Sequence, residues 1–285
     1  MTHPAFCVPN MKSSIKNQLI PIFLTAITCG VLILMLLGLT HVLNLFPTKD
    51  KIFPQFYVAD ILVGFTIYVK TSIDFALFIG NLMSKNQGWK NRIAIEVGTA
   101  LGNGLGTFLI LIIWTFFKEI QPLLAVMIIL AAFVLLRMGE DGLSEILEES
   151  SRGSLIQRLA QSGVQLLSPI NKITAPLLRV LLPASGTKAT TLPSFITLII
   201  FAFTIPFILG LDDFAGYIPL FSIVNVVSFS TGVFLGHMIL NMALFASPTR
   251  TIKIVREPII ALIGSIAFVA IAFWGFVEVF HLFTH

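Results

Sequence analysis

Seven apolar stretches in this chain are each long enough to cross a lipid bilayer, which takes about 20 residues in a helix. Charged residues make up only 11% of the sequence, whereas soluble domains contain about 25%. Because lipid cannot satisfy backbone hydrogen bonds, each stretch must satisfy its own. The sequence therefore predicts an all-α integral membrane protein with seven transmembrane helices. The stretches cover residues 19–46, 57–83, 92–117, 121–138, 193–221, 223–246 and 256–282.

Basic residues are divided unevenly between the two sides that seven helices create. The N-terminus and the loops after the second, fourth and sixth stretches carry 14 of the 18 Lys and Arg residues, and the other side carries only Lys49, Lys51 and Lys118. Cytoplasmic loops of membrane proteins show this excess of positive charge. We therefore expect a plasma (inner) membrane protein with its N-terminus in the cytoplasm and its C-terminus outside. The net charge of +4 reflects this orientation rather than nucleic-acid binding.

Short motifs recur in the same order in two parts of the chain, between 134 and 139 residues apart. Each part would hold three helices, and an odd number makes the second unit enter the membrane from the opposite side. An inverted repeat with an acid in each unit is typical of secondary transporters. The matched motifs are Asp74-Phe75-Ala76 with Asp213-Phe214-Ala215, Gly98-x-x-x-Gly102 with Gly232-x-x-x-Gly236, and Gln121-Pro122 with Glu257-Pro258.

The repeat divides the chain into four parts. Residues 1–56 form an N-terminal tail and an extra first helix, residues 57–138 repeat A, and residues 193–285 repeat B. Residues 139–192 between the repeats form the only long polar stretch. We expect a plain cytoplasmic linker there; because apolar and polar residues alternate, an amphipathic helix on the cytoplasmic surface is the alternative.

Acidic side chains occur inside several apolar stretches, although each costs roughly 2.5 to 3.5 kcal/mol to insert at a helix centre. Asp60 and Glu278 lie near helix ends, where they can reach the membrane surface. Asp74, Asp212 and Asp213 lie deeper and within the repeat. We therefore expect these three carboxylates to bind a metal ion between the two units.

Other polar residues are spaced so that they share helix faces. Glu96 and Asn103 are seven residues apart, and His237 and Asn241 are four apart. Carboxylate, amide and imidazole groups suit a divalent cation. We expect Asn103 and His237 to complete the ion site, Glu96 to act as a proton site or gate, and Asn241 to be a further gating candidate. An interhelical hydrogen bond is the alternative role for His237.

Lys70 lies one helical turn before Asp74, so the two side chains can form an ion pair. An arriving cation could displace the ammonium, which makes Lys70 a gating candidate. The alternatives are a purely structural ion pair and a lysine that extends to the membrane surface.

Glycine and proline positions predict how the helices pack and where one breaks. Small residues repeat every fourth position within residues 98–106 and again at Gly232 and Gly236, which permits close helix contact. We expect this to bring the third and sixth apolar stretches together. Gly210 and Pro219 flank the acids of the fifth stretch and predict a break there.

Residues 212–221, with the sequence Asp-Asp-Phe-Ala-Gly-Tyr-Ile-Pro-Leu-Phe, resemble the acidic segment of the cadmium-resistance (CadD-type) transporters. Residues 71–74, with the sequence Thr-Ser-Ile-Asp, resemble the acidic segment of their first half. That family belongs to the lysine-exporter (LysE) superfamily, with TerC-like relatives. The resemblance implies two inverted three-helix repeats and export of cations or amino acids. The chain departs from the family pattern where Asp213 replaces Asn and Phe75 replaces a second acid.

We interpret the chain as a secondary transporter, not an enzyme, that exports a divalent cation of the manganese, calcium or cadmium class by coupling to H⁺ or Na⁺. The expected partners are the transported metal and the lipid bilayer; a homodimer is left open, and no resident cofactor or nucleic acid is expected. One alternative is an exporter of an amino acid or small organic cation. Another is an intramembrane aspartyl protease, since residues 210–213 distantly resemble the Gly-x-Gly-Asp motif of those enzymes.

Overall fold

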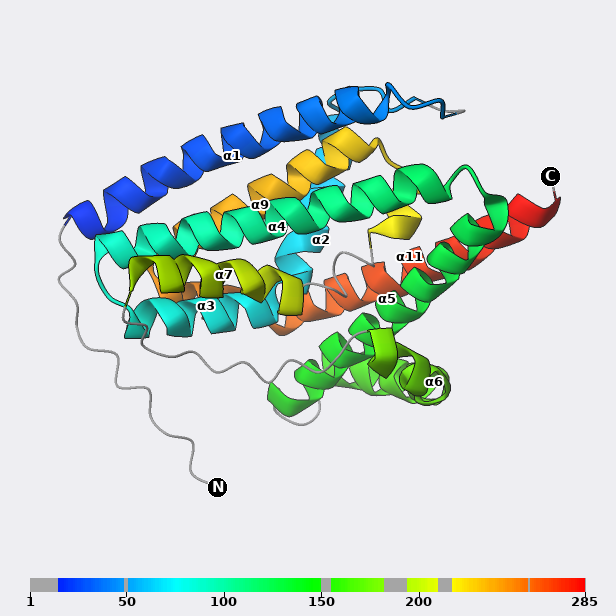
Figure 1. The fold of residues 1–285 in the computed structure, drawn as a ribbon. Helices are drawn as coiled ribbons and strands as arrows, with labels where there is room; N and C mark the ends of the chain where they lie inside the picture. The colour runs from blue at the N-terminus through cyan, green and yellow to red at the C-terminus, as the bar shows by residue number, and fades with distance from the viewer. Residues whose placement is uncertain are drawn as a thin grey trace.

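The computed structural model describes residues 15–48, 51–149, 155–181, 194–209, 217–255 and 257–284, and every regular element within these ranges is helical. In chain order the elements are α1 (Ile15–Leu43), α2 (Val58–Thr71), α3 (Ile73–Lys85), α4 (Trp89–Phe117), α5 (Gln121–Glu149), α6 (Leu155–Leu181), α7 (Phe195–Leu209), the 3₁₀ helix η1 (Ile218–Ser222), α9 (Val226–Ala246), α10 (Pro248–Val255) and α11 (Pro258–Thr284) (Figure 1).

Five of the described helices are long and apolar enough to cross a membrane, as expected of an all-α membrane protein. They are α1, α4, α5, α9 and α11. The second predicted stretch is divided at Ser72 into α2 and α3, which together have the length of one span and are bent by 64°. The fifth begins as the 15-residue helix α7. Its acids, Asp212 and Asp213, lie outside the described residues.

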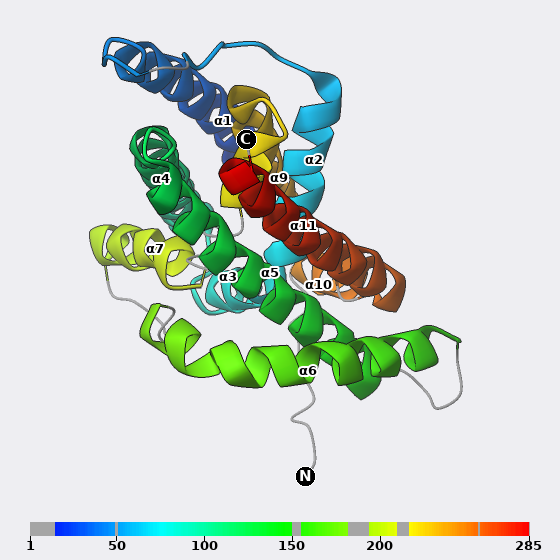
Figure 2. The ribbon, with the colours of Figure 1, turned by 90° about the vertical axis from the view of Figure 1, so that its right-hand side faces the viewer.

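The polar stretch between the predicted repeats is largely helical. α5 does not stop at the end of its apolar sequence near residue 138 but continues to Glu149. Glutamate and leucine, which dominate those extra turns, favour helix. α6 follows and packs against α5, running across the direction of α1 and α4 (Figures 1 and 2).

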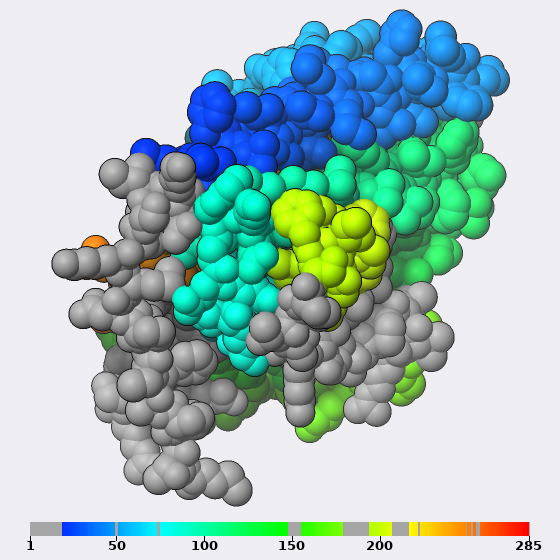
Figure 3. All heavy atoms as spheres, turned by 60° about the vertical axis from the view of Figure 1, so that its left-hand side comes forward, coloured from blue at the N-terminus to red at the C-terminus, as the bar shows by residue number. Residues whose placement is uncertain are grey.

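Three helix pairs make the largest contacts in the described structure, α2 with α9, α4 with α7, and α5 with α11. In terms of the predicted repeats, the first helix of each unit packs on the second helix of the other. The third helices, α5 and α11, pack on each other, and Figure 2 shows them side by side. α1 lies outside these pairs, against α4 and α9, and Figure 3 shows it along the same face of the molecule as α7.

Glycines allow α2 and α9 to touch backbone to backbone. A Cβ at Gly64 would lie 2.1 Å from the carbonyl oxygen of Phe229, and a Cβ at Gly232 would lie 2.1 Å from that of Ile61. Both distances are too short for any side chain, so these positions require glycine. The two helices run parallel, because both begin at the same end of the bundle.

The shared end of α2 and α9 is fixed by hydrogen bonds. The backbone N–H of Asn225 donates to Asp60 at 2.8 Å, and the Asn225 side chain caps α9 by accepting from the Ser228 N–H at 3.0 Å. The Ser228 hydroxyl donates to the carbonyl of Gln55 at 2.8 Å. A carboxylate is favourable at a helix N-terminus, so Asp60 has a structural role there.

The α4–α7 contact is built in the same way. A Cβ at Gly98 would lie 2.5 Å from the carbonyl oxygen of Ile199, and a Cβ at Gly102 would lie 2.4 Å from that of Phe203. Contacts advance along both helices together, so α4 and α7 run parallel. The prediction that these glycines join the third and sixth stretches is wrong for Gly98 and Gly102, since they face α7 rather than α9.

α4 and α9 still meet, but they run antiparallel and through larger side chains. The Arg92 guanidinium at the start of α4 donates to the carbonyl of Phe245 in the last turn of α9 at 2.8 Å. Further along, the rings of Phe108 and Phe234 lie 5.8 Å apart in an edge-to-face arrangement. Between these two contacts the helices enclose polar side chains.

Candidate functional site

A cluster of fully buried polar side chains lies between α4 and α9, with α2 on one side and α1 on another. Glu96 of α4 and His237 and Asn241 of α9 are all 0% exposed. Tyr68 of α2 reaches the cluster because Gly236 lets its ring lie close to α9. Thr25 of α1 is also completely buried here. Apolar helices bear this cost only where the polar groups bind one another or a ligand.

His237 holds the centre of the cluster through both ring nitrogens. Its Nδ1 lies 2.6 Å from the hydroxyl of Tyr68, and its Nε2 lies 3.1 Å from the amide nitrogen of Asn241. An amide N–H₂ only donates, so Nε2 accepts and the ring hydrogen is on Nδ1. The bond to Tyr68 is the interhelical hydrogen bond that is the alternative to the predicted role of His237 as an ion ligand. A metal would have to displace one of the two partners.

Glu96 differs from its neighbours because its carboxyl group is not paired. Neither oxygen has a hydrogen-bond partner among the described residues. The Thr25 hydroxyl and the Asn241 amide are polar neighbours that interact with the carboxyl group, but Thr25 donates to the Pro21 carbonyl at 2.8 Å and Asn241 donates to His237 at 3.1 Å. An ionised carboxylate buried without a partner costs several kcal/mol. Glu96 is therefore suited to hold a proton or a cation, and its role as a proton site or gate stays a prediction.

Asn103 is the second polar side chain on the same face of α4. It is 2% exposed, and its amide nitrogen has no hydrogen-bond partner within the described structure. The two predicted ligands therefore differ. The amide nitrogen of Asn103 has no hydrogen-bond partner among the described residues, whereas both ring nitrogens of His237 are hydrogen-bonded.

The side chains of the three predicted metal-binding aspartates lie outside the described residues. Asp74 lies in the first turn of α3, directly after the bend, but its side chain is outside the described part, as are Asp212 and Asp213. Within the described residues, no group of three or more His, Cys, Asp and Glu side chains could hold a metal. The metal site thus stays a prediction.

Residues next to these acids nevertheless contact α9. Phe75, which follows Asp74, places its ring 5.3 Å from the ring of His237. Tyr217, four residues after Asp213, is completely buried with its ring 5.1 Å from that of Phe229. Described residues close in sequence to each set of predicted acids therefore contact the helix that carries His237 and Asn241.

Lys70 is buried on a different side of α2. Its side chain is 6% exposed and lies across Gly264 of α11, where a Cβ would meet its Cγ at 2.1 Å. Its ammonium has no hydrogen-bond partner among the described residues and lies beside Gly142 of α5, with Glu145 as the acid that acts on it electrostatically. The predicted ion pair with Asp74 involves a side chain outside the described part.

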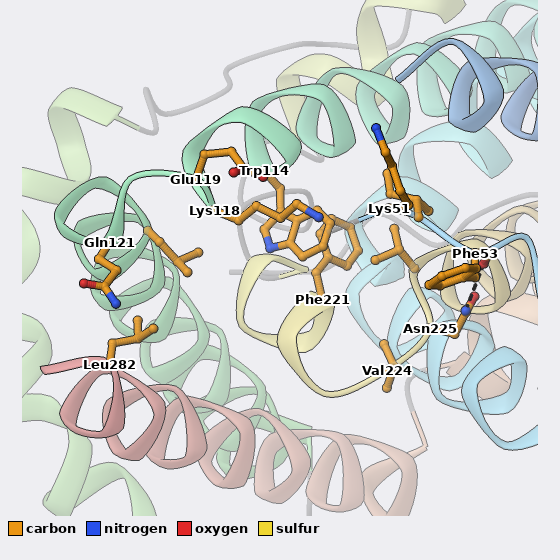
Figure 4. Close-up of a pocket in the computed structure, with 13 residues that line it drawn as sticks. Lys51, Phe53, Trp114, Lys118, Glu119, Gln121, Phe221, Val224, Asn225 and Leu282 are labelled. Carbon is orange, nitrogen blue, oxygen red and sulfur yellow. Dashed lines mark hydrogen bonds between the residues drawn. The ribbon is translucent and has the colours of Figure 1, made fainter. Parts of the chain in front are cut away.

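A pocket of about 510 Å³ opens at the end of the bundle where α4 ends and α9 begins (Figure 4). The Lys118 ammonium lies 4.8 Å from the centre of the Trp114 ring, and the ring of Phe221 in η1 lies 5.5 Å from the same ring. Phe221 of η1 and residues 224–226 line another part of the pocket. No sequence pattern predicted it, since its walls come from segments far apart in the chain.

Sequence reasoning missed Tyr68, Thr25 and Thr99 as members of the buried cluster. The position of Tyr68 could have predicted a buried hydrogen bond, because a tyrosine within an apolar stretch needs a partner for its hydroxyl group. The threonines carried none, since each also bonds to its own helix. Thr25 donates to the Pro21 carbonyl and Thr99 to the Ile95 carbonyl, at 2.8 and 2.9 Å.

No protein-family model matches the chain, and no match was found among the curated proteins or the solved structures. The similarity to cadmium-resistance transporters therefore rests on the two acidic segments alone.

Replacing Tyr68 with phenylalanine should destabilise the protein by about 1 to 3 kcal/mol, because a buried polar atom of His237 loses its partner. Thermal unfolding in detergent would measure this. Tyr57→Phe is the matched control, since Tyr57 is 50% exposed and its hydroxyl group donates to the exposed side chain of Gln55. Equal unfolding temperatures for the two variants would contradict the buried hydrogen bond.

Proposed function

We propose that the protein is a secondary transporter that exports a divalent metal cation in exchange for protons. The helix directions are the single observation that carries the proposal. α2 is parallel to α9, α4 is parallel to α7, and α4 is antiparallel to α9. Two inverted three-helix units would have these helix directions. In such an arrangement the first helix of each unit packs against the second helix of the other unit.

The positions of polar groups within this arrangement support transport. Inverted-repeat transporters bind their substrates where the repeats meet, often beside discontinuous helices. The bend at Ser72 interrupts the second apolar stretch directly before Asp74. The buried cluster lies where α4 of one predicted unit meets α9 of the other, and Phe75 and Tyr217, which are close in sequence to the predicted acids, contact α9.

In the proposed mechanism, Asp74 and one or both of Asp212 and Asp213 bind the cation, and Asn103 supplies a neutral ligand. Hard oxygen ligands favour manganese or calcium over softer metals. Glu96 takes up a proton in the buried polar cluster between α4 and α9 and releases it when the bundle opens to the other side. Tyr68, His237 and Asn241 keep α2, α4 and α9 in register around it.

Flux measurements in liposomes test the proposal. The purified protein should move manganese, and Asp74→Asn or Asp213→Asn should reduce the flux to that of empty liposomes, since an amide lacks the charge that compensates the ion. Comparing the flux of Asp212→Asn with that of Asp213→Asn shows which of these two neighbouring acids binds the cation. Glu278→Gln, near the end of α11, is the matched control and should keep full flux.

Parallel measurements with calcium, cadmium and lysine separate the alternatives. Lysine flux that depends on the same acids, without metal flux, would indicate an exporter of organic cations. Metal flux that survives all three Asp→Asn changes would refute the proposed site.

A further inference from the structure

α6 packs against α5 at the level where α5 changes from apolar to charged sequence. The Asn171 amide donates to the Leu136 carbonyl at 3.3 Å and to the Glu140 carboxylate at 2.6 Å. Eight residues earlier, Gly163 fits against Leu143, whose Cδ1 would lie 2.5 Å from a Cβ at that position. The apolar stretch of α5 ends near residue 138, and Glu140 and Asp141 are the first acids after it. α6 therefore lies at the boundary between the lipid-facing and water-facing parts of α5.

The side chains of α6 form three separate faces. Successive residues turn by about 100° around a helix, so residues three, four and seven apart share a face. One face packs against α5 and is buried, and a polar face contains Gln161 and Gln165. A third face is apolar but exposed. The buried face consists of Ala160, Leu167, Asn171, Thr174 and Leu178, and the exposed apolar face of Leu155 (77% exposed), Leu159 (59%), Leu166 (67%), Ile173 (81%) and Leu177 (48%).

The charges of α6 are all of one sign. Its sequence contains Arg158, Lys172 and Arg179 and no acidic residue. Anionic lipid headgroups attract basic residues next to a membrane, and interfacial helices combine such residues with an apolar face. A second copy of α6 is a less suitable partner, because two such helices would bring like charges together.

From these observations we infer that α6 is an interfacial helix that binds an anionic lipid leaflet. Its exposed apolar face, from Leu155 to Leu177, enters the boundary between headgroups and acyl chains. Its basic residues bind lipid phosphates, and its buried face stays on α5. A helix beside a transmembrane helix needs these three faces, because protein lies on one side, lipid below and water above. The inference does not depend on the proposed transport activity.

Spin labels on single cysteines test the inference in full-length protein, with Cys7 and Cys29 replaced by serine. The protein is reconstituted in vesicles of phosphatidylcholine and phosphatidylglycerol. Labels at Leu166→Cys and Ile173→Cys should collide more often with oxygen, which concentrates in lipid, than with a water-soluble nickel chelate. Labels at Gln161→Cys and Gln165→Cys, the matched controls, should show the reverse order.

Three results would overturn the inference. In the first, the labels at both Leu166→Cys and Ile173→Cys collide more often with the nickel chelate than with oxygen, which would place this face in water. The second is spin–spin broadening at these positions, which would show that a second copy covers them. The third is an unchanged oxygen-to-nickel ratio in vesicles of phosphatidylcholine alone, which would refute binding to anionic headgroups. A lower ratio in those vesicles supports it.

Discussion

Glu96→Gln should abolish cation transport that is driven by a proton gradient while leaving the exchange of one cation for another intact. The carboxyl group of Glu96 is completely buried, and its polar neighbours Thr25 and Asn241 already bond to Pro21 and His237. Glutamine has nearly the same shape but cannot bind or release a proton. Exchange of manganese on one side for radioactive manganese on the other needs no net proton movement. The two activities should therefore separate, with gradient-driven accumulation falling to the level of empty liposomes.

Glu257→Gln is the control for this experiment. Glu257 is exposed before the first turn of α11, and the matched position in the predicted first repeat is already a glutamine, Gln121. Both activities should survive in this variant. Gradient-driven accumulation at the normal rate in Glu96→Gln would show that the proton passes elsewhere. Loss of both activities in a folded variant would make Glu96 a cation ligand rather than a proton site.

The stability of Glu96→Gln provides an independent check. Replacing an unpaired buried acid with a neutral group of the same size removes the cost of burying a charge. The variant should unfold in detergent at the same temperature as the unmodified protein or above it. A large decrease would mean that the carboxyl group makes a structural bond.

Hydropathy alone predicted most of the fold, because burial in lipid requires long apolar helices. The apolar stretches at residues 19–46, 92–117 and 223–246 correspond to α1, α4 and α9. The bend at Ser72 was not predicted, since neither glycine nor proline marks it. The extension of α5 to Glu149 was also missed, because hydropathy detects only the part of a helix that faces lipid.

The candidate site was predictable only in part. Spacing on one helix placed His237 beside Asn241, and their contact is present at 3.1 Å. Spacing could not show which other helix these residues face. The bond from Tyr68 to His237 joins residues 169 positions apart, and it depends on where glycines let α2 approach α9. Sequence spacing also could not show which helix the repeated glycines contact. They were predicted to join α4 to α9, but Gly98 and Gly102 face α7, and Gly232 and Gly236 face α2.

Gly232→Ala should destabilise the protein by about 3 kcal/mol or prevent its folding, because overpacking at a tight contact costs about 1 to 3 kcal/mol and more where the backbone must move. The new Cβ would lie 2.1 Å from the Ile61 carbonyl oxygen and 2.8 Å from the Phe65 nitrogen, and neither can rotate away. α2 and α9 would have to separate, which would also break the bond between Tyr68 and His237. Thermal unfolding in detergent should show a decrease of about 10 °C.

Two further variants decide whether this effect comes from the helix contact. Gly30→Ala in α1 is the control, since a Cβ there meets nothing within 4 Å and alanine favours helix. It should unfold at an unchanged or higher temperature. Gly98→Ala should behave like Gly232→Ala, because its Cβ would lie 2.5 Å from the Ile199 carbonyl oxygen in the α4–α7 contact. If only one of Gly98→Ala and Gly232→Ala is destabilising, the two contacts are not equivalent, and the inverted repeat on which the proposed transport mechanism depends loses its support.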